Sequence, residues 1–277
     1  MVRQTKINSN AKVNLALRIT GKRPDGYHTL STLFQEIDFH DEIIFKPADE
    51  FDFICSDKSL PVDKKNLCVA AYYEMKKYYA GKQEFRITLE KNVPVGAGLG
   101  GGSSNGAAVI KFLNTAWGLN FDKNKLMKIA LALGCDLPFY INGKTQIAEG
   151  VGEILQPVKF SENFVFLLVL PQIAISTVWA YKNFNLTNRK EGFKFARFFQ
   201  RNNKVWKMFE NQFEDIVFRS YPKIGELKQK LIKNNALYAG LSGSGSTVVG
   251  IFSNKKKARE VQSRFHSNNT IISLPIF

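Results

Sequence analysis

The chain has 277 residues and carries 39 lysines and arginines against 24 aspartates and glutamates, a formal net charge of +15. This length supports a substantial core and commonly divides into two domains, and the charge favours anionic partners. Three cysteines are too few and too dispersed for a disulfide framework or a zinc site, so a reducing compartment is expected.

The sequence shows neither an export signal nor a stretch that could cross a membrane. Residues before Ala11 include Arg3 and Lys6 but no apolar run, so we expect no secretory signal. The longest apolar run, Phe164–Leu170, is far too short to cross a bilayer and predicts a buried strand. We therefore expect a cytoplasmic protein that makes no contact with membranes.

The segment from Asn10 to Ile19 alternates apolar and polar residues with the period of a half-buried strand. Successive side chains of a strand point to opposite faces, so Lys12 and Asn14 share one face and the apolar residues share the other. Taken alone, a lysine in a strand is usually a surface residue whose ammonium group stays in water.

A loop rich in turn residues, Gly21–Gly26, follows this strand. It predicts a hairpin-like turn that brings Tyr27 and His28 to the start of the next strand. In that position a tyrosine and a histidine are most often a packed ring and a hydrogen-bonded imidazole. Apolar residues over 30–55 then predict several strands.

Two further elements lead to the glycine-rich part of the chain. Residues 63–79 have apolar side chains at helical spacing, with Gly81 as the stop. Residues 85–89 alternate as a strand.

The stretch from Pro94 to Ser104, which we call the glycine loop, contains five glycines. Glycine adopts positive φ without steric cost and lets a ligand approach the backbone. Ser103 and Ser104 are favoured helix N-caps, and apolar residues spaced by three to four from Ala107 predict an amphipathic helix. Glycines that lead into a helix form an anion site, because the unpaired N–H groups and the positive end of the dipole coincide. The expected ligand is a phosphate chain.

Three alternatives for the glycine loop are weaker. A Walker A loop requires Gly-Lys-Ser/Thr, and here Ser103 follows Gly102 directly. A dinucleotide-binding pattern is formally present from Gly96 to Gly101, but the connection from Lys91 to Pro94 separates it from the preceding strand. A flexible linker is disfavoured by the ordered segments on both sides.

Asp122 predicts the N-cap of a further helix, which Gly134 ends. Asp136 then lies on a short bend, because Pro138 disfavours helical geometry in the residue before it. An aspartate at such a bend is most often a helix cap. Residues 145–158 predict a hairpin that closes the first domain.

The remaining residues predict a second domain. Strands are expected at 164–170, 237–241, 247–252 and 270–276, and helices at 177–184, 204–218, 222–234 and 255–265. This order fits a β-α-β-β-α-β ferredoxin-like domain with an extra helical insert. The domains would span 1–158 and 159–277. A second glycine turn, Leu241–Ser246, is by itself an ordinary tight hairpin.

The glycine loop resembles the nucleotide loop of the GHMP kinases, the superfamily of galactokinase, homoserine kinase and mevalonate kinase. It has the pattern Pro-x-x-x-Gly-Leu-Gly, followed by two more glycines and Ser-Ser. Three other segments resemble the branch of this family that acts on a cytidine-diphosphate-linked sugar alcohol: Ala11-Lys12-Val13-Asn14, Asp25-Gly26-Tyr27-His28 and Gly134-Cys135-Asp136-Leu137-Pro138-Phe139. The resemblance implies an α+β, two-domain GHMP kinase fold, with a first domain like domain 2 of ribosomal protein S5 and a ferredoxin-like second domain.

The resemblance also implies roles for individual residues. Lys12 and Asp136 would be catalytic. ATP would be bound by Pro94, Val95, Gly96, Ala97, Gly98, Leu99, Gly100, Gly101, Gly102, Ser103 and Ser104, with Asn66 near the adenine. The substrate would be bound by Asn14, Tyr27, His28 and Tyr181, where Tyr181 either covers the cytosine or faces the core. The second glycine turn would brace the active site.

The implied activity is ATP-dependent phosphorylation of the 2-hydroxyl of 4-diphosphocytidyl-2-C-methyl-D-erythritol, in non-mevalonate isoprenoid biosynthesis. Mg²⁺ is expected with ATP; its protein ligand is unknown, with Ser104 as a candidate. We expect a monomer or weak homodimer that binds no nucleic acid. Two alternatives stay open: another GHMP kinase, such as homoserine or mevalonate kinase, and an RNA-binding protein, which the +15 charge favours.

Overall fold

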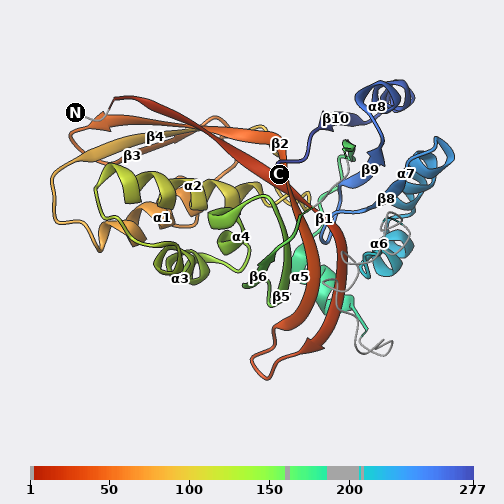
Figure 1. Ribbon diagram of the computed structural model, residues 1–277, viewed down its shortest axis with the longest axis horizontal. Helices are drawn as coiled ribbons and strands as arrows, with labels where there is room; N and C mark the ends of the chain where they lie inside the picture. The colour runs from red at the N-terminus through yellow and green to blue at the C-terminus, as the bar shows by residue number, and fades with distance from the viewer. Residues whose placement is uncertain (1–2, 160–162, 186–205, 207–208) are drawn as a thin grey trace. The chain divides into compact units, whose positions relative to one another are not determined.

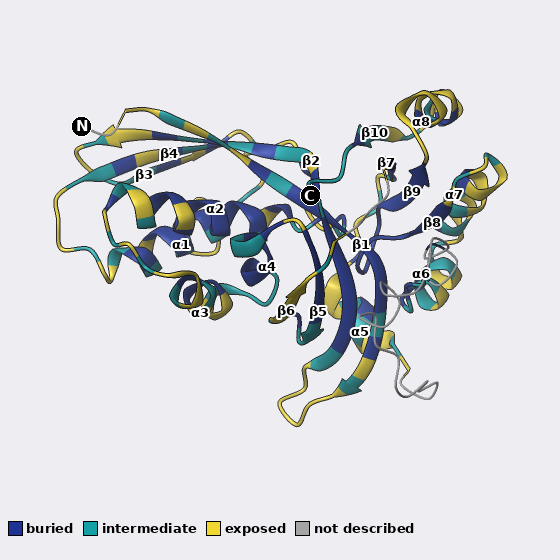
Figure 2. Ribbon diagram, viewed as in Figure 1, coloured by how far each residue is buried: buried dark blue, intermediate teal, exposed yellow. Residues whose placement is uncertain are grey.

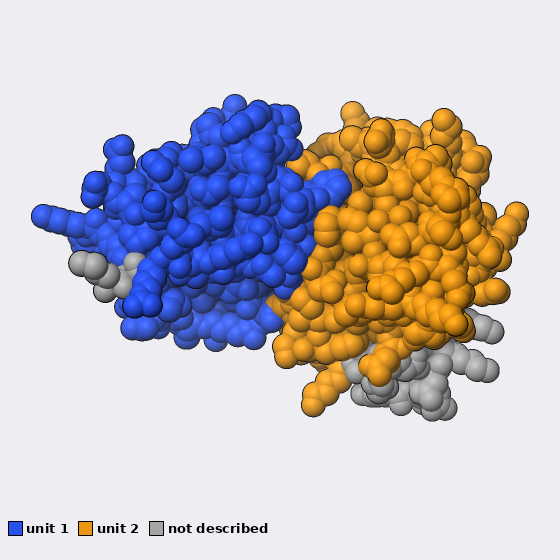
Figure 3. Space-filling view, turned by 90° about the horizontal axis from the view of Figure 1, so that it is seen from above, with its two compact units in different colours: residues 1–11, 40–94, 100–142 blue, residues 12–39, 95–99, 143–277 orange. Residues whose placement is uncertain are grey.

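The computed structural model describes residues 3–159, 163–185, 206 and 209–277. The chain forms two compact units, each assembled from separate segments (Figure 3). Unit 1 comprises Met1–Ala11, His40–Pro94 and Gly100–Asn142. Unit 2 comprises Lys12–Phe39, Val95–Leu99 and Gly143–Phe277. The division of the sequence into 1–158 and 159–277 stays a prediction.

The strands of unit 1 include part of β2 (His28–Ala48), the 21-residue strand that runs through both units. Its second half pairs antiparallel with β4 (Glu84–Glu90), and β4 pairs in parallel with β3 (Asp52–Cys55). The apolar residues of β4 are buried at alternate positions, as predicted. One face of β4 therefore belongs to the core of unit 1.

Four helices complete unit 1 (Figure 1): α1 (Leu67–Lys76), α2 (Gly101–Ala116), α3 (Lys123–Leu133) and α4 (Leu137–Asn142). Helix α2 is buried along most of its length, as its dark blue ribbon in Figure 2 shows. Its apolar residues join a single cluster with residues of β2, β4 and α1. Asp122 caps α3 as predicted, because its carboxylate accepts a hydrogen bond from the N–H of Lys125 at 2.8 Å.

Unit 2 begins at Lys12, within β1 (Thr5–Lys22), and the turn over residues 23–27 joins β1 to β2, its pairing partner. The first half of β2 pairs antiparallel with β5 (Thr145–Gly150), and β5 pairs antiparallel with β6 (Ile154–Pro157). The hairpin predicted over 145–158 is thereby confirmed.

A second sheet of unit 2 has the strand order β10-β7-β9-β8. Its strands are β7 (Val165–Leu170), β8 (Tyr238–Leu241), β9 (Val248–Phe252) and β10 (Asn269–Ser273). Its helices are α5 (Thr177–Asn183), α6 (Glu214–Ser220), α7 (Pro222–Lys233) and α8 (Lys255–Gln262). All three strand pairs of this sheet are antiparallel. Together with the strand order, this pairing confirms the predicted ferredoxin-like domain.

The helix predicted over 204–218 is shorter in the described residues. Helix α6 begins at Glu214, and residues 209–213 form a turn with a bridge to β1. Most of 204–208 lies outside the described residues. The apolar run at 164–170 forms the buried strand β7, as predicted. In the described ranges, every helix is too short or too polar to traverse a bilayer.

A buried aspartate, Asp41 of β2, holds the segment that leads to the glycine loop. Its carboxylate accepts hydrogen bonds from the N–H groups of Asn92 and Val93, each at 2.7 Å. It also pairs with Lys91 at 2.8 Å and accepts a bond from Asn105 Nδ2 of α2 at 3.0 Å. The side chains of Asp41 and Lys91 are 0% and 6% exposed, so the loss of either partner leaves an unpaired buried charge.

Replacing Asp41 by alanine is expected to lower the free energy of unfolding by about 3–5 kcal/mol, because Lys91 and two N–H groups lose their acceptor. The matched control is Asp52→Ala, which breaks the pair with Arg86, whose side chains are 42% and 51% exposed. That control should lower stability by less than about 1 kcal/mol. Urea unfolding followed by circular dichroism measures both, and equal losses would contradict the role of Asp41.

Candidate functional site

The glycine loop has the backbone conformation that its composition favours. Gly96, Gly98 and Gly100 have φ angles of +68°, +76° and +68°, a left-handed region in which side chains are strained. Gly101 and Gly102 instead form the first turn of α2. Left-handed residues in such a turn are typical of backbone that directs its N–H groups toward an anion.

The prediction that Ser103 and Ser104 cap this helix is wrong. The N-cap is Gly100, which is left-handed, and no side chain caps the helix there. Because the left-handed glycine lets the chain enter the helix early, both serines lie within its first turn. Ser104 is buried, and its hydroxyl accepts a hydrogen bond from Ser9 Oγ at 2.7 Å.

The first turn of α2 suits a bound phosphate. The first N–H groups of an α-helix have no partner within the helix, and the helix dipole is positive at this end. The first turn of α2 contains no acidic residue that would repel an anion. Gly102 is exposed and Ser103 is half-buried, so a ligand can approach this turn.

The second glycine turn, Leu241–Ser246, contacts the glycine loop. Ser242 Oγ donates a hydrogen bond to the carbonyl of Gly98 at 2.9 Å, and the N–H of Thr247 donates one to the carbonyl of Ala97 at 3.2 Å. A Cβ atom on Gly98 would lie only 2.0 Å from the carbonyl oxygen of Ser242. The predicted contact is confirmed, and it requires glycine at position 98.

Lys12 and Asn14 share a face of β1, as predicted, but both are buried, with exposed fractions of 4% and 3%. Lys12 Nζ donates hydrogen bonds to Asn14 Oδ1 at 2.6 Å and to the carbonyl of Gly98 at 3.3 Å. It also lies 4.9 Å from the centre of the Phe34 ring. Lys12 is therefore no surface residue: its ammonium group supplies positive charge beside the glycine loop, where charges are weakly screened.

Asn14 is held from three sides. Its Nδ2 donates to Thr32 Oγ1 at 2.8 Å, and its backbone N–H donates to Ser242 Oγ at 3.1 Å. Thr32 in turn donates to the carbonyl of Ala16 at 2.6 Å. We call Lys12, Asn14, Thr32, Gly98 and Ser242 the lysine network. Because its polar atoms bond to one another, the network fixes the position of Lys12.

Asp136 lies in the turn between α3 and α4, as predicted, and is half-buried. Leu137 is nevertheless helical, because Pro138 falls in the first turn of α4, where its missing N–H breaks no helical hydrogen bond. Asp136 belongs to unit 1 and Lys12 to unit 2. Their joint catalytic role stays a prediction.

The loop between β1 and β2 exposes Tyr27, whose residue surface is 60% accessible. The turn is closed by hydrogen bonds from Arg23 N to the carbonyl of Tyr27 at 2.7 Å and from Tyr27 N to Asp25 Oδ1 at 3.1 Å. Gly26 has a φ of +89°. The ring of Tyr27 is thus presented to solvent by a well-defined turn.

His28 stacks on Tyr181 of α5, with ring centroids 5.2 Å apart. Tyr181 also meets Phe213 edge to face at 4.9 Å and is packed against the core of unit 2. Burial, and then the positive charge of Lys22, lower the pKa of His28 below its usual value. The imidazole is therefore neutral at pH 7. Cytosine binding by Tyr27, His28 and Tyr181 stays a prediction.

Asn66 caps helix α1. Its Oδ1 accepts a hydrogen bond from Cys68 N at 3.0 Å, and its Nδ2 donates to the carbonyl of Pro61 at 3.0 Å. These bonds give Asn66 a structural role. Its contact with adenine stays a prediction.

Two residues that hold the lysine network escape analysis of the sequence. Thr32 is a polar residue next to apolar residues of β2, and only the structure shows that it is completely buried. Asn211 donates to the carbonyls of Leu241 and Gly243, which lie 30 and 32 residues further along the chain. No local pattern predicts such a pairing.

A metal ion would need ligands from outside the protein as well. In the ranges that the structure describes, no group of three or more histidine, cysteine, aspartate or glutamate side chains could hold an ion. Phosphate oxygens can supply most ligands of Mg²⁺, which keeps several waters and binds few protein oxygens.

Family models match both parts of the chain. The model of the GHMP kinases N terminal domain matches residues 66–144, and that of the GHMP kinases C terminal domain matches residues 195–270. The first match contains the whole glycine loop and Asp136, and the second contains Asn211 and the second glycine turn.

Curated relatives and solved structures agree with these matches. A 4-diphosphocytidyl-2-C-methyl-D-erythritol kinase of Prosthecochloris aestuarii is 40% identical over 91% of this chain and 90% of its own length. The enzyme of the same name from Chlorobium chlorochromatii is 42% identical over 90% of this chain and 88% of its own length. A crystal structure of 4-(cytidine 5'-diphospho)-2C-methyl-D-erythritol kinase superposes with a TM-score of 0.84 at 27% identity, covering 98% of this chain and 99% of that one. Homoserine kinase from Cytophaga hutchinsonii shares the fold, with a TM-score of 0.74 at 15% identity over 100% and 95%. The chain belongs to the GHMP kinases.

Proposed function

We propose that this protein transfers the γ-phosphoryl group of ATP to the 2-hydroxyl of 4-diphosphocytidyl-2-C-methyl-D-erythritol, giving the 2-phosphate and ADP. The observation that carries the proposal is the buried ammonium group of Lys12, bonded to the Gly98 carbonyl of the glycine loop. The choice of alcohol is supported by the names of the relatives that are about 40% identical over most of the chain.

The glycine loop is proposed to bind the ATP phosphates through its backbone. The residues from Pro94 to Ser104 offer N–H groups at left-handed glycines and at the start of α2, which suits an anion. Mg²⁺ would accompany the nucleotide, with the Ser104 hydroxyl as its candidate protein ligand, and would neutralise phosphate charge. Asn66 is the candidate for the adenine end.

Asp136 and Lys12 are proposed as the catalytic pair. Phosphoryl transfer has a loose transition state rich in charge, so positioning and electrostatics supply most of the catalysis. The carboxylate of Asp136 accepts the proton of the attacking hydroxyl. The ammonium group of Lys12 stabilises negative charge on the attacking oxygen and on the transferred phosphoryl group.

The cytidine end of the substrate is assigned to Tyr27, His28 and Tyr181, with Asn14 nearer the alcohol. The exposed ring of Tyr27 and the stacked pair of His28 and Tyr181 offer flat surfaces of the kind on which bases stack. A neutral imidazole offers one donor and one acceptor to the edge of a base. We place the reaction in the cytoplasm, where ATP is available, and expect a monomer or weak homodimer.

A substrate panel tests the proposal against its rivals. Release of ADP is measured by a coupled assay with the cytidylylated erythritol, homoserine and mevalonate in separate reactions. We expect turnover with the first alone, since we propose that the Asp25-Gly26-Tyr27-His28 segment binds cytidine. Turnover with homoserine or mevalonate instead would assign the chain to another GHMP kinase activity. Salt-sensitive RNA binding without ADP release would support the RNA-binding alternative.

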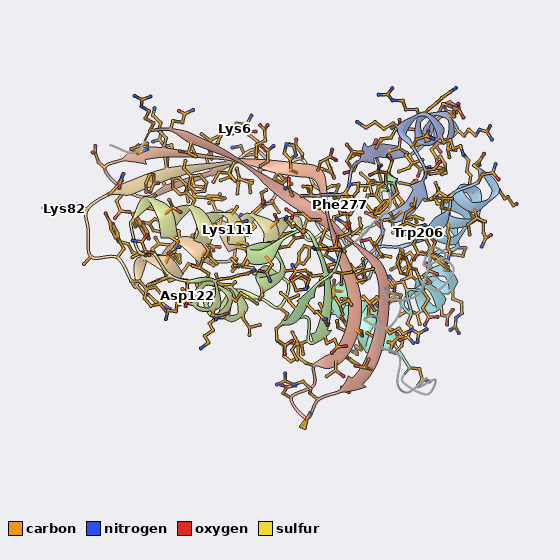
Figure 4. All side chains as sticks on the ribbon, in the orientation of Figure 1. Lys6, Lys82, Lys111, Asp122, Trp206 and Phe277 are labelled. Atoms are coloured by element: carbon orange, nitrogen blue, oxygen red, sulfur yellow. The ribbon has the colours of Figure 1, made fainter. Side chains whose placement is uncertain are left out.

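Replacing either catalytic residue is expected to lower kcat by about 10²–10⁴-fold with little change in ATP affinity. The variants are Asp136→Asn and Lys12→Met, and affinity is measured by calorimetry. Matched controls are Lys6→Met, which changes another lysine of β1 and breaks its ion pair with Glu42 of β2, and Asp122→Asn, which keeps an oxygen to cap α3. Lys6 and Asp122 are labelled in Figure 4.

Both controls should keep kcat within about twofold of the unmodified protein. A folded Asp136→Asn or Lys12→Met variant with full activity would remove that residue from the mechanism. A large loss in the controls would show that kcat responds to any change of surface charge.

The pH dependence of kcat/KM for the cytidylylated substrate should contain an acid limb from His28. Protonation replaces the acceptor nitrogen by a donor, so activity falls as the pH drops through the pKa of the free enzyme. Because that pKa is lowered in the fold, the limb should lie below 6.5. It should disappear in His28→Asn and persist in His266→Asn, which changes an exposed histidine. A limb that survives in His28→Asn belongs to another group.

A further inference from the structure

Asn211 lies in the short segment that precedes α6 and is 3% exposed. This segment forms a parallel bridge to β1 at Leu17. The N–H of Leu17 donates to the carbonyl of Glu210 at 2.8 Å, and the N–H of Gln212 donates to the carbonyl of Leu17 at 3.0 Å. The backbone of Asn211 is thereby fixed to the strand that carries Lys12.

The side chain of Asn211 is bonded at both ends of its amide. Its Nδ2 donates to the carbonyls of Leu241 and Gly243, each at 2.8 Å, and its Oδ1 accepts from the N–H of Phe213 at 3.0 Å. The two carbonyls flank Ser242 in the second glycine turn. Asn211 therefore clamps the turn on both sides of the serine that joins it to the lysine network.

The position of Ser242 has little freedom. Its hydroxyl bonds to the Gly98 carbonyl and accepts from Asn14 N. On Gly98, a Cβ would lie 2.0 Å from the Ser242 carbonyl, and on Gly243 a Cβ would lie 3.3 Å from Asn14 Oδ1. A small shift of the turn would therefore disturb the glycine loop and the acceptor of Lys12 together, since close-packed atoms transmit displacement.

A second anchor holds the same turn from the first residue of α6. Glu214 Oε1 accepts a hydrogen bond from Leu241 N at 2.9 Å, and the carboxylate of Glu214 pairs with Lys228 of α7. Glu214 fixes the strand end before the turn. Of these two residues, only Asn211 is hydrogen-bonded to Gly243, the residue that follows Ser242.

We propose that Asn211 is a positioning residue of the kinase reaction: it holds Ser242 against Gly98 and Asn14, and through them sets the place of the Lys12 ammonium group. The inference rests on the proposed function. Asn211 touches neither nucleotide nor alcohol in this scheme and acts only through the second glycine turn. Its loss should therefore lower kcat more than it raises the KM for ATP.

Two variants of Asn211 test this role. Asn211→Asp keeps the shape and the acceptor for Phe213 N but places one carboxylate oxygen against the two carbonyls, whereas Asn211→Ala removes the side chain and carries the test if the first variant does not fold. Each is expected to lower kcat about 10- to 100-fold, the effect of misplacing a catalytic group by up to about 1 Å. The control is Val217→Ala, which opens the same core from α6 but removes no hydrogen bond to the turn, because the side chain of valine has no polar atom.

The control separates positioning from stability. Val217→Ala should lower the melting temperature yet keep kcat within about twofold of the unmodified protein. A double-mutant cycle with Ser242→Ala gives the second readout. Since Asn211 acts through Ser242, the kcat of the Asn211→Ala/Ser242→Ala double variant should be within about twofold of that of the less active single variant. The effects of Val217→Ala and Ser242→Ala on kcat should instead multiply, as they do for independent sites.

Each result is decisive. A folded Asn211 variant with unchanged kcat, a loss matched by Val217→Ala, or independent effects of Asn211→Ala and Ser242→Ala would overturn the inference and leave the proposed function intact. Unmodified protein that is inactive with the whole substrate panel would instead overturn the proposed function and the inference with it.

Discussion

The approach of two backbones at Gly98 is the constraint on which the lysine network depends. The carbonyl of Ser242 occupies the volume that a side chain at position 98 would need. This closeness lets one hydroxyl bond both to the glycine loop and to β1, so the loop and the strand share an attachment point. Lys12 then finds its acceptors, Asn14 Oδ1 and the Gly98 carbonyl, already in place. A preorganised cation needs no rearrangement when charge develops on a phosphoryl group.

Buried polar side chains hold the backbone segments that adjoin the glycine loop. In unit 1, Asp41 binds two N–H groups of the segment before the loop and an amide of α2. In unit 2, Asn211 binds two carbonyls of the turn that contacts Gly98. Backbone partners cannot be changed by substitution, so these contacts depend on the one side chain that makes them. Each such group is also expensive to leave unpaired, which ties the geometry of the loop to folding.

The fold could be predicted from the sequence wherever local pattern determines it. The alternation of β4, the cap at Asp122 and the order of elements after residue 164 all follow from neighbours in the chain. The start of α2 could not be predicted from local pattern, because the left-handed conformation of Gly100 overrides the capping preference of the serines. The burial of Lys12 could not be predicted either, since the alternation of apolar and polar residues along β1 does not show that both faces of the strand are buried. Asp41 and Asn211 gain their importance from partners more than 25 residues away, beyond the reach of any local pattern.

The interleaving of the two units limits how this protein can be divided. The chain passes from one unit to the other five times, at residues 11, 39, 94, 99 and 142. No single cleavage therefore separates the two units. Even a cut after residue 142, which keeps all of unit 1 on one fragment, leaves the segments 12–39 and 95–99 of unit 2 on that same fragment.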